Sequence, residues 1–127
     1  DGSDLRIKLS KDEVKEIRKN IEDGLQERIN IAKNSILDRV IKVLEKAKEK
    51  LSEKDATFRD TLMGNIQSTI EVIPTMNFDN DEQIIKVRKK LKKLMIAPAK
   101  LRNDNKAKKK VVKDIAKLLK KIGKIKF

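Results

Sequence analysis

Apolar residues recur every three or four positions along most of this chain, which is the spacing of one face of an α-helix. The longest run holds eleven apolar positions and no proline, and its mean spacing of about 3.7 residues exceeds the 3.5 of a left-handed coiled coil. We therefore expect a nearly straight helix over residues 11–53, long enough to be a spine for shorter helices or for a second chain. The run consists of Val14, Ile17, Ile21, Leu25, Ile29, Ala32, Ile36, Val40, Val43, Ala47 and Leu51.

Two signals bear on where this long helix begins. Ser10 and Glu13 form an S-x-x-E capping box just before the apolar run, which predicts a helix start at residue 11. Upstream of the box, apolar and basic residues alternate over 5–9 with the period of two that is typical of a strand. We therefore expect residues 1–10 to form an extended arm, either a short strand or a segment packed on a helix.

Three shorter amphipathic helices are expected after the long one. Asp55 is placed to cap the first, and Pro74 ends it because proline disfavours helical geometry in the residue before it. A second proline, Pro98, separates the next two helices, and Gly123 ends the last. The turn signals and aromatic residues of a sheet are scarce. The sequence predicts one elongated all-α helical bundle over 1–127, with its short helices at 55–73, 80–95 and 104–122.

The connector that follows Pro74 raises two expectations. Met76 and Phe78 are unusually apolar for a loop, and we expect both to pack into the core. Asp79 and Asp81 alternate like the first ligands of a calcium loop, but no glycine follows at the sharp turn and no glutamate stands at the far end. The two acids are therefore expected to cap the next helix rather than to hold a metal ion.

Several side chains that carry out catalysis are missing. The chain has no cysteine and no histidine, hence no thiolate nucleophile, no imidazole base and no cysteine-ligated metal. Tyrosine and tryptophan are also absent. Carboxylates such as Asp60 and Glu71 could assist a metal ion, but their spacing gives no sign of a site. We expect a protein that is not an enzyme and has no cofactor, and the cytoplasm is its default location. No apolar run approaches the length of a membrane span.

Positive charge is concentrated in the last third of the chain. Residues 86–127 contain 18 of the 33 lysines and arginines and only two acids, a net charge of +16, whereas residues 1–85 sum to −3. Charge this uneven bears on partners and solubility rather than on fold. The concentration of positive charge indicates a surface that binds an anion.

The basic residues fall on the outward faces of the last two predicted helices. On a helical wheel of about 100° per residue, seven lysines of the last helix share one face, with Asp114 near its edge and only Lys108 out of place. Several of these lysines lie four residues apart, a spacing at which like charges are mildly destabilising. The candidate binding residues are Lys86, Lys89, Lys90, Lys93, Lys106, Lys109, Lys110, Lys113, Lys117, Lys120 and Lys121.

Three interpretations of these lysines compete. They could be a solvated surface, or lie near acids of the long helix such as Glu13 and Glu27. They could hold a nucleic-acid backbone without reading its sequence, because lysine lacks the bidentate reach of arginine and aromatic stacking platforms are scarce. Residues 111–127 also have the pattern of a cationic helix that lies in a membrane surface, although the bundle needs the same apolar face for its core. We expect backbone binding, with membrane binding disfavoured.

Short motifs in the second half of the chain occur in a familiar order. They read FRDTL at 58–62, N at 65, IPTMN at 73–77 and PAKLRN at 98–103. This order resembles the C-terminal region of a family of bacteriophage and bacterial proteins of unknown function, in which the run reads approximately F-R-D-S-L, then L-P-x-L-N, then L-R. The resemblance covers residues 58–122 and departs at Thr61, at Met76 and in the lysine-rich last helix. It implies a phage or bacterial setting, the cytoplasm of a bacterial host cell, and no particular activity.

The functional prediction is a non-enzymatic helical module that binds a polyanion, namely the backbone of DNA or RNA, through its C-terminal lysines. The alternative is a phage or bacterial structural or regulatory module. That module would bind a protein partner, or a second copy of itself, through the long amphipathic helix.

Overall fold

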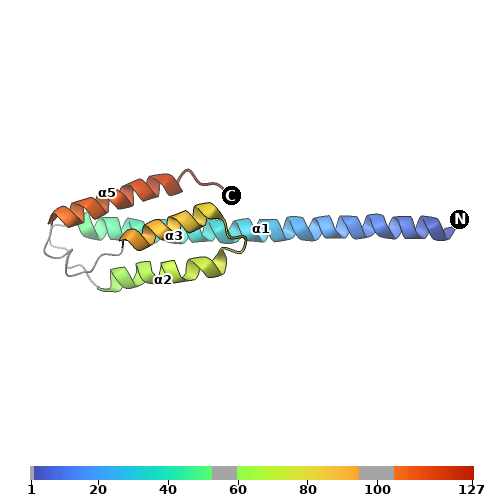
Figure 1. The fold of residues 1–127 in the computed structure, drawn as a ribbon, viewed down its shortest axis with the longest axis horizontal. Coiled ribbons are helices and arrows are strands. Elements are labelled where there is room, and N and C mark those ends of the chain that lie inside the picture. Colours follow the sequence, from blue (N-terminus) through green and yellow to red (C-terminus); the bar gives the residue numbers. More distant parts are fainter. Residues whose placement is uncertain (1, 53–59, 95–104) are drawn as a thin grey trace.

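The computed structural model describes residues 2–52, 60–94 and 105–127, with side chains from residues 10, 63 and 106 onward in these segments. All regular structure in the described segments is helical, which confirms the predicted all-α class (Figure 1). The features predicted at Asp55 and Pro98 lie outside the described residues. The helices are α1 (Gly2–Ser52), α2 (Asp60–Met76), α3 (Glu82–Leu94) and α5 (Asn105–Ile122).

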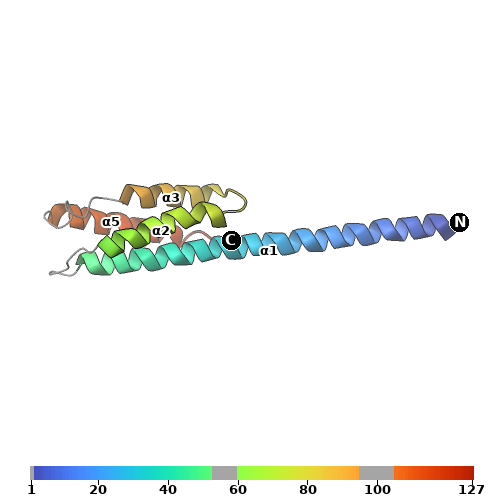
Figure 2. The ribbon, with the colours of Figure 1, turned by 90° about the horizontal axis from the view of Figure 1, so that it is seen from below.

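The described helices form an up-down-up-down bundle at one end of α1. The chain reverses direction from each helix to the next, and α1 packs against α2, α2 against α3, and α3 against α5. Because α5 also packs against α1, the ring is closed and α1 lies diagonally opposite α3 (Figure 2). This arrangement is typical of antiparallel helical bundles with short connections.

The core of the bundle is one continuous apolar cluster to which each of these helices contributes. In α3 the buried residues are Ile84, Val87, Leu91 and Leu94, which recur every three or four positions. Burying a side chain of this size stabilises the fold by roughly 1.5–3 kcal/mol. The other buried apolar residues are Ile36, Leu37, Val40, Leu44, Ala47 and Leu51 of α1, Met63, Ile66, Ile70 and Ile73 of α2, and Val111, Ile115, Leu118 and Ile122 of α5.

Only the C-terminal half of α1 belongs to the bundle. The helix has 51 residues and is about 75 Å long at 1.5 Å per residue, and its first half extends beyond the other helices (Figure 1). We call residues 10–28 the projecting segment. Four residues of the predicted apolar run lie in it and are roughly half exposed: Val14 at 47%, Ile17 at 56%, Ile21 at 56% and Leu25 at 52%.

The start of α1 differs from the prediction. The helix begins at Gly2, so residues 2–10 are helical rather than an extended arm, and Ser10 does not cap the helix. Residues 5–9 are leucine, isoleucine, arginine and lysine, mostly good helix formers, with no proline or glycine among them. Extending an existing helix costs far less than starting one, and the described residues contain no strand with which this segment could pair.

The end of α2 also differs, because the helix continues through Pro74 to Met76. Proline has no N–H, so the carbonyl of Ile70, four residues earlier, loses its helical donor. Arg88 of α3 replaces that donor, and its Nε donates to the Ile70 oxygen at 2.9 Å. The predicted end at residue 73 is wrong because a neighbouring helix makes up for the hydrogen bond that proline removes.

In the connector after α2, Met76 packs partly buried against the core as predicted, but Phe78 is 64% exposed. Asn77 is buried in its place, because its Oδ1 accepts a hydrogen bond from the Asp81 N–H at 3.0 Å. Asp81 in turn caps α3, since its Oδ1 accepts from the N–H of Gln83 at 2.8 Å. The predicted capping role of Asp81 is confirmed, and the predicted burial of Phe78 is wrong.

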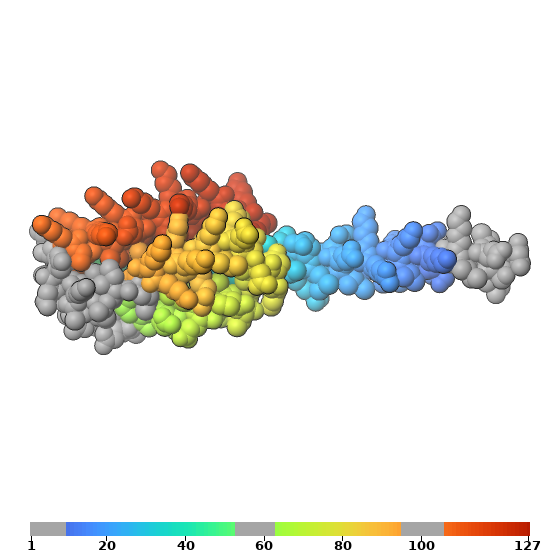
Figure 3. All heavy atoms as spheres, in the orientation of Figure 1, coloured from blue at the N-terminus to red at the C-terminus, as the bar shows by residue number. Residues whose placement is uncertain are grey.

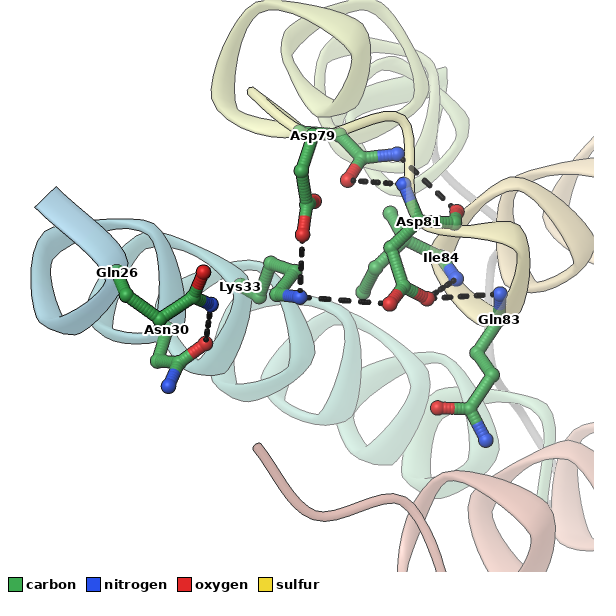
Figure 4. Close-up of polar contacts among 8 residues, drawn as sticks. Gln26, Asn30, Lys33, Asp79, Asp81, Gln83 and Ile84 are labelled. Carbon is green, nitrogen blue, oxygen red and sulfur yellow. Dashed lines mark hydrogen bonds and ion pairs between the residues drawn. The ribbon is translucent and has the colours of Figure 1, made fainter. Parts of the chain in front are cut away.

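A buried lysine joins three parts of the bundle (Figure 4). Lys33 of α1 is 4% exposed, and its Nζ lies 2.8 Å from Oδ2 of Asp79 and 3.3 Å from Oδ2 of Asp81. The same ammonium lies 4.3 Å from the centre of the Phe127 ring. Burial lowers the pKa of Lys33, but the two aspartates outweigh it and raise the pKa above its ordinary value. We call this group the Lys33 clamp, because it fixes both the connector and the C-terminal residue on α1.

Candidate functional site

The predicted binding lysines lie on α3 and α5, which pack side by side (Figure 3). All eleven are in described helix, and all except the half-buried Lys90 are exposed. The apolar sides of both helices are in the core, so the charge is confined to the outward surface. We call these eleven residues the lysine face.

Four residues of the lysine face line a groove between the two helices. Lys90 and Lys93 come from α3, and Lys117 and Lys121 come from α5. The groove has a volume of about 320 Å³ and is also lined by Leu94, Leu118 and Asp114. We call it the lysine groove. The other seven residues of the face lie outside it, on exposed surface of the same two helices.

Like charges meet inside the lysine groove. Lys121 lies against Lys90 and is the main cause of a pKa for the Lys90 ammonium that is below its ordinary value. Desolvation lowers this pKa further, as do the charges of Lys93 and Lys86. Because each cation disfavours the charged form of its neighbours, the free protein bears an electrostatic cost here that a bound anion would remove.

Carboxylates do little to offset this charge. Asp114 lines the groove but forms no ion pair within the described residues. The acids of α1 that were an alternative partner for the lysines, including Glu13 and Glu27, lie on the projecting segment, and none of them pairs with a described lysine of α3 or α5. These acids of the projecting segment therefore do not neutralise the lysines of the groove.

Arginine adds little to this surface. Arg88 is half-buried, and its Nε is bonded to the Ile70 carbonyl. The other arginine of the basic third, Arg102, lies outside the described residues. Lysine ammonium groups, which act as point charges without a fixed donor geometry, thus supply the positive charge of the described face.

The apolar side of α5 is already occupied. Val111, Ile115, Leu118 and Ile122 are between 1% and 3% exposed in the bundle core. A helix that lies in a lipid surface inserts this kind of face, so α5 offers a membrane only its charge while the bundle is intact. None of the helices in the described segments is long and apolar enough to cross a bilayer.

A second groove, between α1 and α2, is larger at about 510 Å³. Its charged lining mixes signs, with Arg39, Lys42 and Lys46 beside Glu45 and Glu49. Such a lining has little net attraction for either an anion or a cation. Within the described parts of the chain, no group of three or more acids is placed to hold a metal ion.

Comparison of this chain with protein-family models, with curated proteins and with solved structures finds no match. The resemblance of residues 58–122 to phage and bacterial proteins therefore stays a prediction. Inference about function rests on the surface of the protein itself.

The Lys33 clamp and the lysine groove are two of the features that were not predicted from the sequence. Lys33 interrupts the apolar run three residues before Ile36, and a cation at such a position is a signal for a buried partner among the unassigned acids. The lysine groove required knowing that α3 and α5 are neighbours. The connector between them is short enough to favour antiparallel packing, and this was the available signal.

Proposed function

We propose that this protein is a non-enzymatic module that binds the sugar-phosphate backbone of nucleic acid, DNA or RNA, through the lysine face. The observation that carries the proposal is the lysine groove, in which Lys90 and Lys121 are held together although their charges repel. A phosphate placed between the two ammonium groups is attracted by both and offsets their repulsion.

The dimensions of the face suit an extended anion. Lys106 to Lys121 spans about 23 Å along α5 at about 1.5 Å per residue, which matches about seven base pairs of duplex at 3.4 Å each. The lysines of α3 run beside them, so the face is two helices wide. A polymer of phosphates contacts several of these lysines at once, whereas a single small anion occupies only the groove.

Binding of this kind is independent of base sequence. Bidentate recognition of a base edge in the major groove is typically made by arginine, and Arg88 is engaged with Ile70. Stacking of single-stranded bases needs aromatic platforms, and the chain has neither tyrosine nor tryptophan. Charge attraction to phosphates remains as the source of affinity, together with release of the counterions that the phosphates had condensed.

The first test is the salt dependence of duplex binding. With six or more phosphate contacts, affinity is expected to fall about 10³-fold between 50 and 200 mM salt, measured by fluorescence anisotropy of a labelled duplex. Two duplexes of unrelated sequence are expected to bind equally well. The absence of binding by folded protein at the lower salt concentration would contradict the proposal.

The second test assigns binding to the groove. Exchanging its four lysines for glutamine is expected to reduce the slope of log affinity against log salt by roughly 3.6, about 0.9 for each phosphate contact. The same change is expected not to lower the melting temperature, because it relieves repulsion between like charges. The variant is Lys90→Gln, Lys93→Gln, Lys117→Gln and Lys121→Gln.

A matched control removes the same number of charges elsewhere and is expected to change the slope by less than about one. If both variants weaken binding equally, net charge alone is responsible and the assignment to the lysine groove is wrong. The control variant is Lys19→Gln, Lys42→Gln, Lys46→Gln and Lys48→Gln, all of them exposed residues of α1.

A second candidate function is a structural or regulatory module that binds protein through α1. The half-exposed apolar residues of the projecting segment favour it, because contiguous apolar surface on a helix is a docking surface. The two functions use different residues, so changes in the projecting segment are expected to leave the salt slope per bound chain unaltered.

A further inference from the structure

The projecting segment carries an apolar stripe that no described residue covers. Its members are Val14, Ile17, Ile21 and Leu25, which fall within about 80° of one another on a wheel of about 100° per residue. Each is about half exposed, although a lone helix in water gains most of its stability from packing such a face. Packing the stripe against another helix would therefore bury apolar surface that is now exposed to water.

The stripe and the buried face of α1 lie on different sides of the helix. On an ideal wheel its centre is about a quarter of a turn from the centre of the buried positions, which run from Ile36 to Leu51. A second helix laid on the stripe therefore runs along the side of α1 and is not directed into the core helices.

We propose that the stripe packs on the same stripe of a second copy of this chain, in the antiparallel direction. This inference stands independently of nucleic-acid binding, which uses other residues. The stripe is nearly symmetric about the midpoint between residues 19 and 20. An antiparallel pair centred there brings Val14 level with Leu25 of the second copy and places Ile17 beside Ile21 of the second copy, so apolar meets apolar along the whole contact.

Some of the charges beside the stripe are complementary in this arrangement. In an antiparallel pair each flank of a helix meets the same flank of its partner. On one flank Glu22 of the second copy comes level with residue 17, between Lys15 and Arg18. Glu13, on the other flank, comes within two residues of Arg28 of the second copy, which lies in line with the stripe just beyond its end. All of these charged side chains are exposed, and two-fold symmetry makes each contact twice.

The charge of the bundle decides the direction of pairing. Residues 86–127 have a net charge of +16, so a parallel pair would place two strongly basic bundles side by side. In the antiparallel pair the bundles lie at opposite ends of the shared helices. Their centres are then roughly 70 Å apart at 1.5 Å per residue, several times the screening length of about 8 Å at physiological salt. Repulsion between the bundles is thus avoided while the stripe is covered.

The first experiment measures the mass of the full chain in solution by sedimentation equilibrium, over about 1 to 100 μM protein in about 0.3 M salt. The expected mass at the upper concentrations is twice the 14.6 kDa of the chain. The variant Ile17→Gln with Ile21→Gln keeps helix-forming residues at exposed positions and is expected to be a monomer throughout. The matched variant Ile31→Gln with Ile85→Gln removes two exposed apolar residues outside the stripe and is expected to remain a dimer.

The second experiment tests the direction of pairing with disulfides, which the cysteine-free chain makes unambiguous. A mixture of the single variants Val14→Cys and Leu25→Cys is expected to form the mixed disulfide under mild oxidation. Val14→Cys alone is expected to remain reduced, because a disulfide between two copies of residue 14 requires parallel helices.

Three results would overturn the inference. The unaltered chain could be a monomer at every concentration, its dimer could survive the glutamine substitutions at residues 17 and 21, or the cross-link could form only between identical positions. None of these results bears on the lysine face. Duplex binding that persists in a monomeric Ile17→Gln, Ile21→Gln variant would show that the two proposals fail or hold separately.

Discussion

The two halves of α1 share one apolar spacing and have opposite surroundings. Ile36 and Leu44, in the bundle half, are at most 1% exposed, whereas Ile17 and Ile21, in the projecting segment, are 56% exposed. The difference comes from length: α1 has 51 residues, but α2, α3 and α5 have 17, 13 and 18. Helices that short leave the first half of α1 uncovered. The spacing of apolar residues thus predicts that a helix has a face to bury, and the lengths of the other helices determine how much of that face the same chain covers.

The largest contrast is expected between two substitutions in α1 itself. Leu44→Ala creates a cavity at a fully buried position and is expected to cost about 2–5 kcal/mol in the free energy of unfolding. Ile31→Ala, at a residue that is 58% exposed, is expected to change it by less than about 0.5 kcal/mol. Urea denaturation followed by circular dichroism measures both. Similar losses at the two positions would mean that the exposed side of α1 is packed in solution.

A smaller effect is expected at the Ile70 carbonyl, which accepts a hydrogen bond from Arg88 of α3 in place of the one that Pro74 cannot donate. Arg88→Met leaves the Ile70 carbonyl without its donor and is expected to cost about 1–2 kcal/mol. In a Pro74→Ala background the helix supplies that donor itself, so the same Arg88→Met change is expected to cost clearly less. The check is a double-mutant cycle in urea. Additive effects would show that Arg88 and Pro74 are not linked through this carbonyl.

The Lys33 clamp is expected to contribute less, and in a way that depends on pH. Lys33→Met replaces the buried charge with an apolar chain of similar size and leaves Asp79 and Asp81 partly exposed to water, so the expected loss is about 1 kcal/mol. The folded-state pKa of Lys33 lies above its ordinary value of 10.5, so folding favours the charged form. The advantage of the unaltered chain is therefore complete below about pH 10.5 and is lost as the pH rises through the folded pKa.

Urea denaturation of both proteins between about pH 8 and pH 12 gives this difference, because the two chains differ only at residue 33. A difference that stays constant over the range would show that the clamp stabilises by packing alone.

The smallest effect is expected in the projecting segment and is local. A Cβ added at Gly24 meets no atom within 4 Å, so Gly24→Ala gains helix propensity of about 1 kcal/mol without a steric cost. Amide hydrogen exchange is expected to slow about fivefold in the projecting segment, and the unfolding of the bundle is expected to stay unchanged. Slower exchange throughout the bundle would indicate that both halves of α1 open together.

Local patterns predicted the parts of the fold that are decided locally. The outward lysines of α5 follow from residue spacing within one helix, and they were predicted. The contacts that were missed join distant residues: Lys33 and Asp79 are 46 positions apart, and Arg88 and Ile70 are 18 apart. Such contacts depend on which helices become neighbours. The helical state of residues 2–10 was missed for a different reason, because a two-residue alternation over five positions is weaker than the tendency of a long helix to extend.

Because α1 is continuous, inserting or deleting residues in it changes both its length and the direction in which the stripe faces. The stripe and the bundle that carries the lysine face are joined by one continuous helix. The geometry of that helix alone therefore sets the orientation of the stripe relative to the bundle. One residue inserted between them shifts the projecting segment by about 1.5 Å and rotates it by about 100°. Eleven residues, close to three full turns, restore the orientation while adding about 16 Å. We therefore expect insertions and deletions in α1 to preserve this orientation only when they come close to whole turns of the helix.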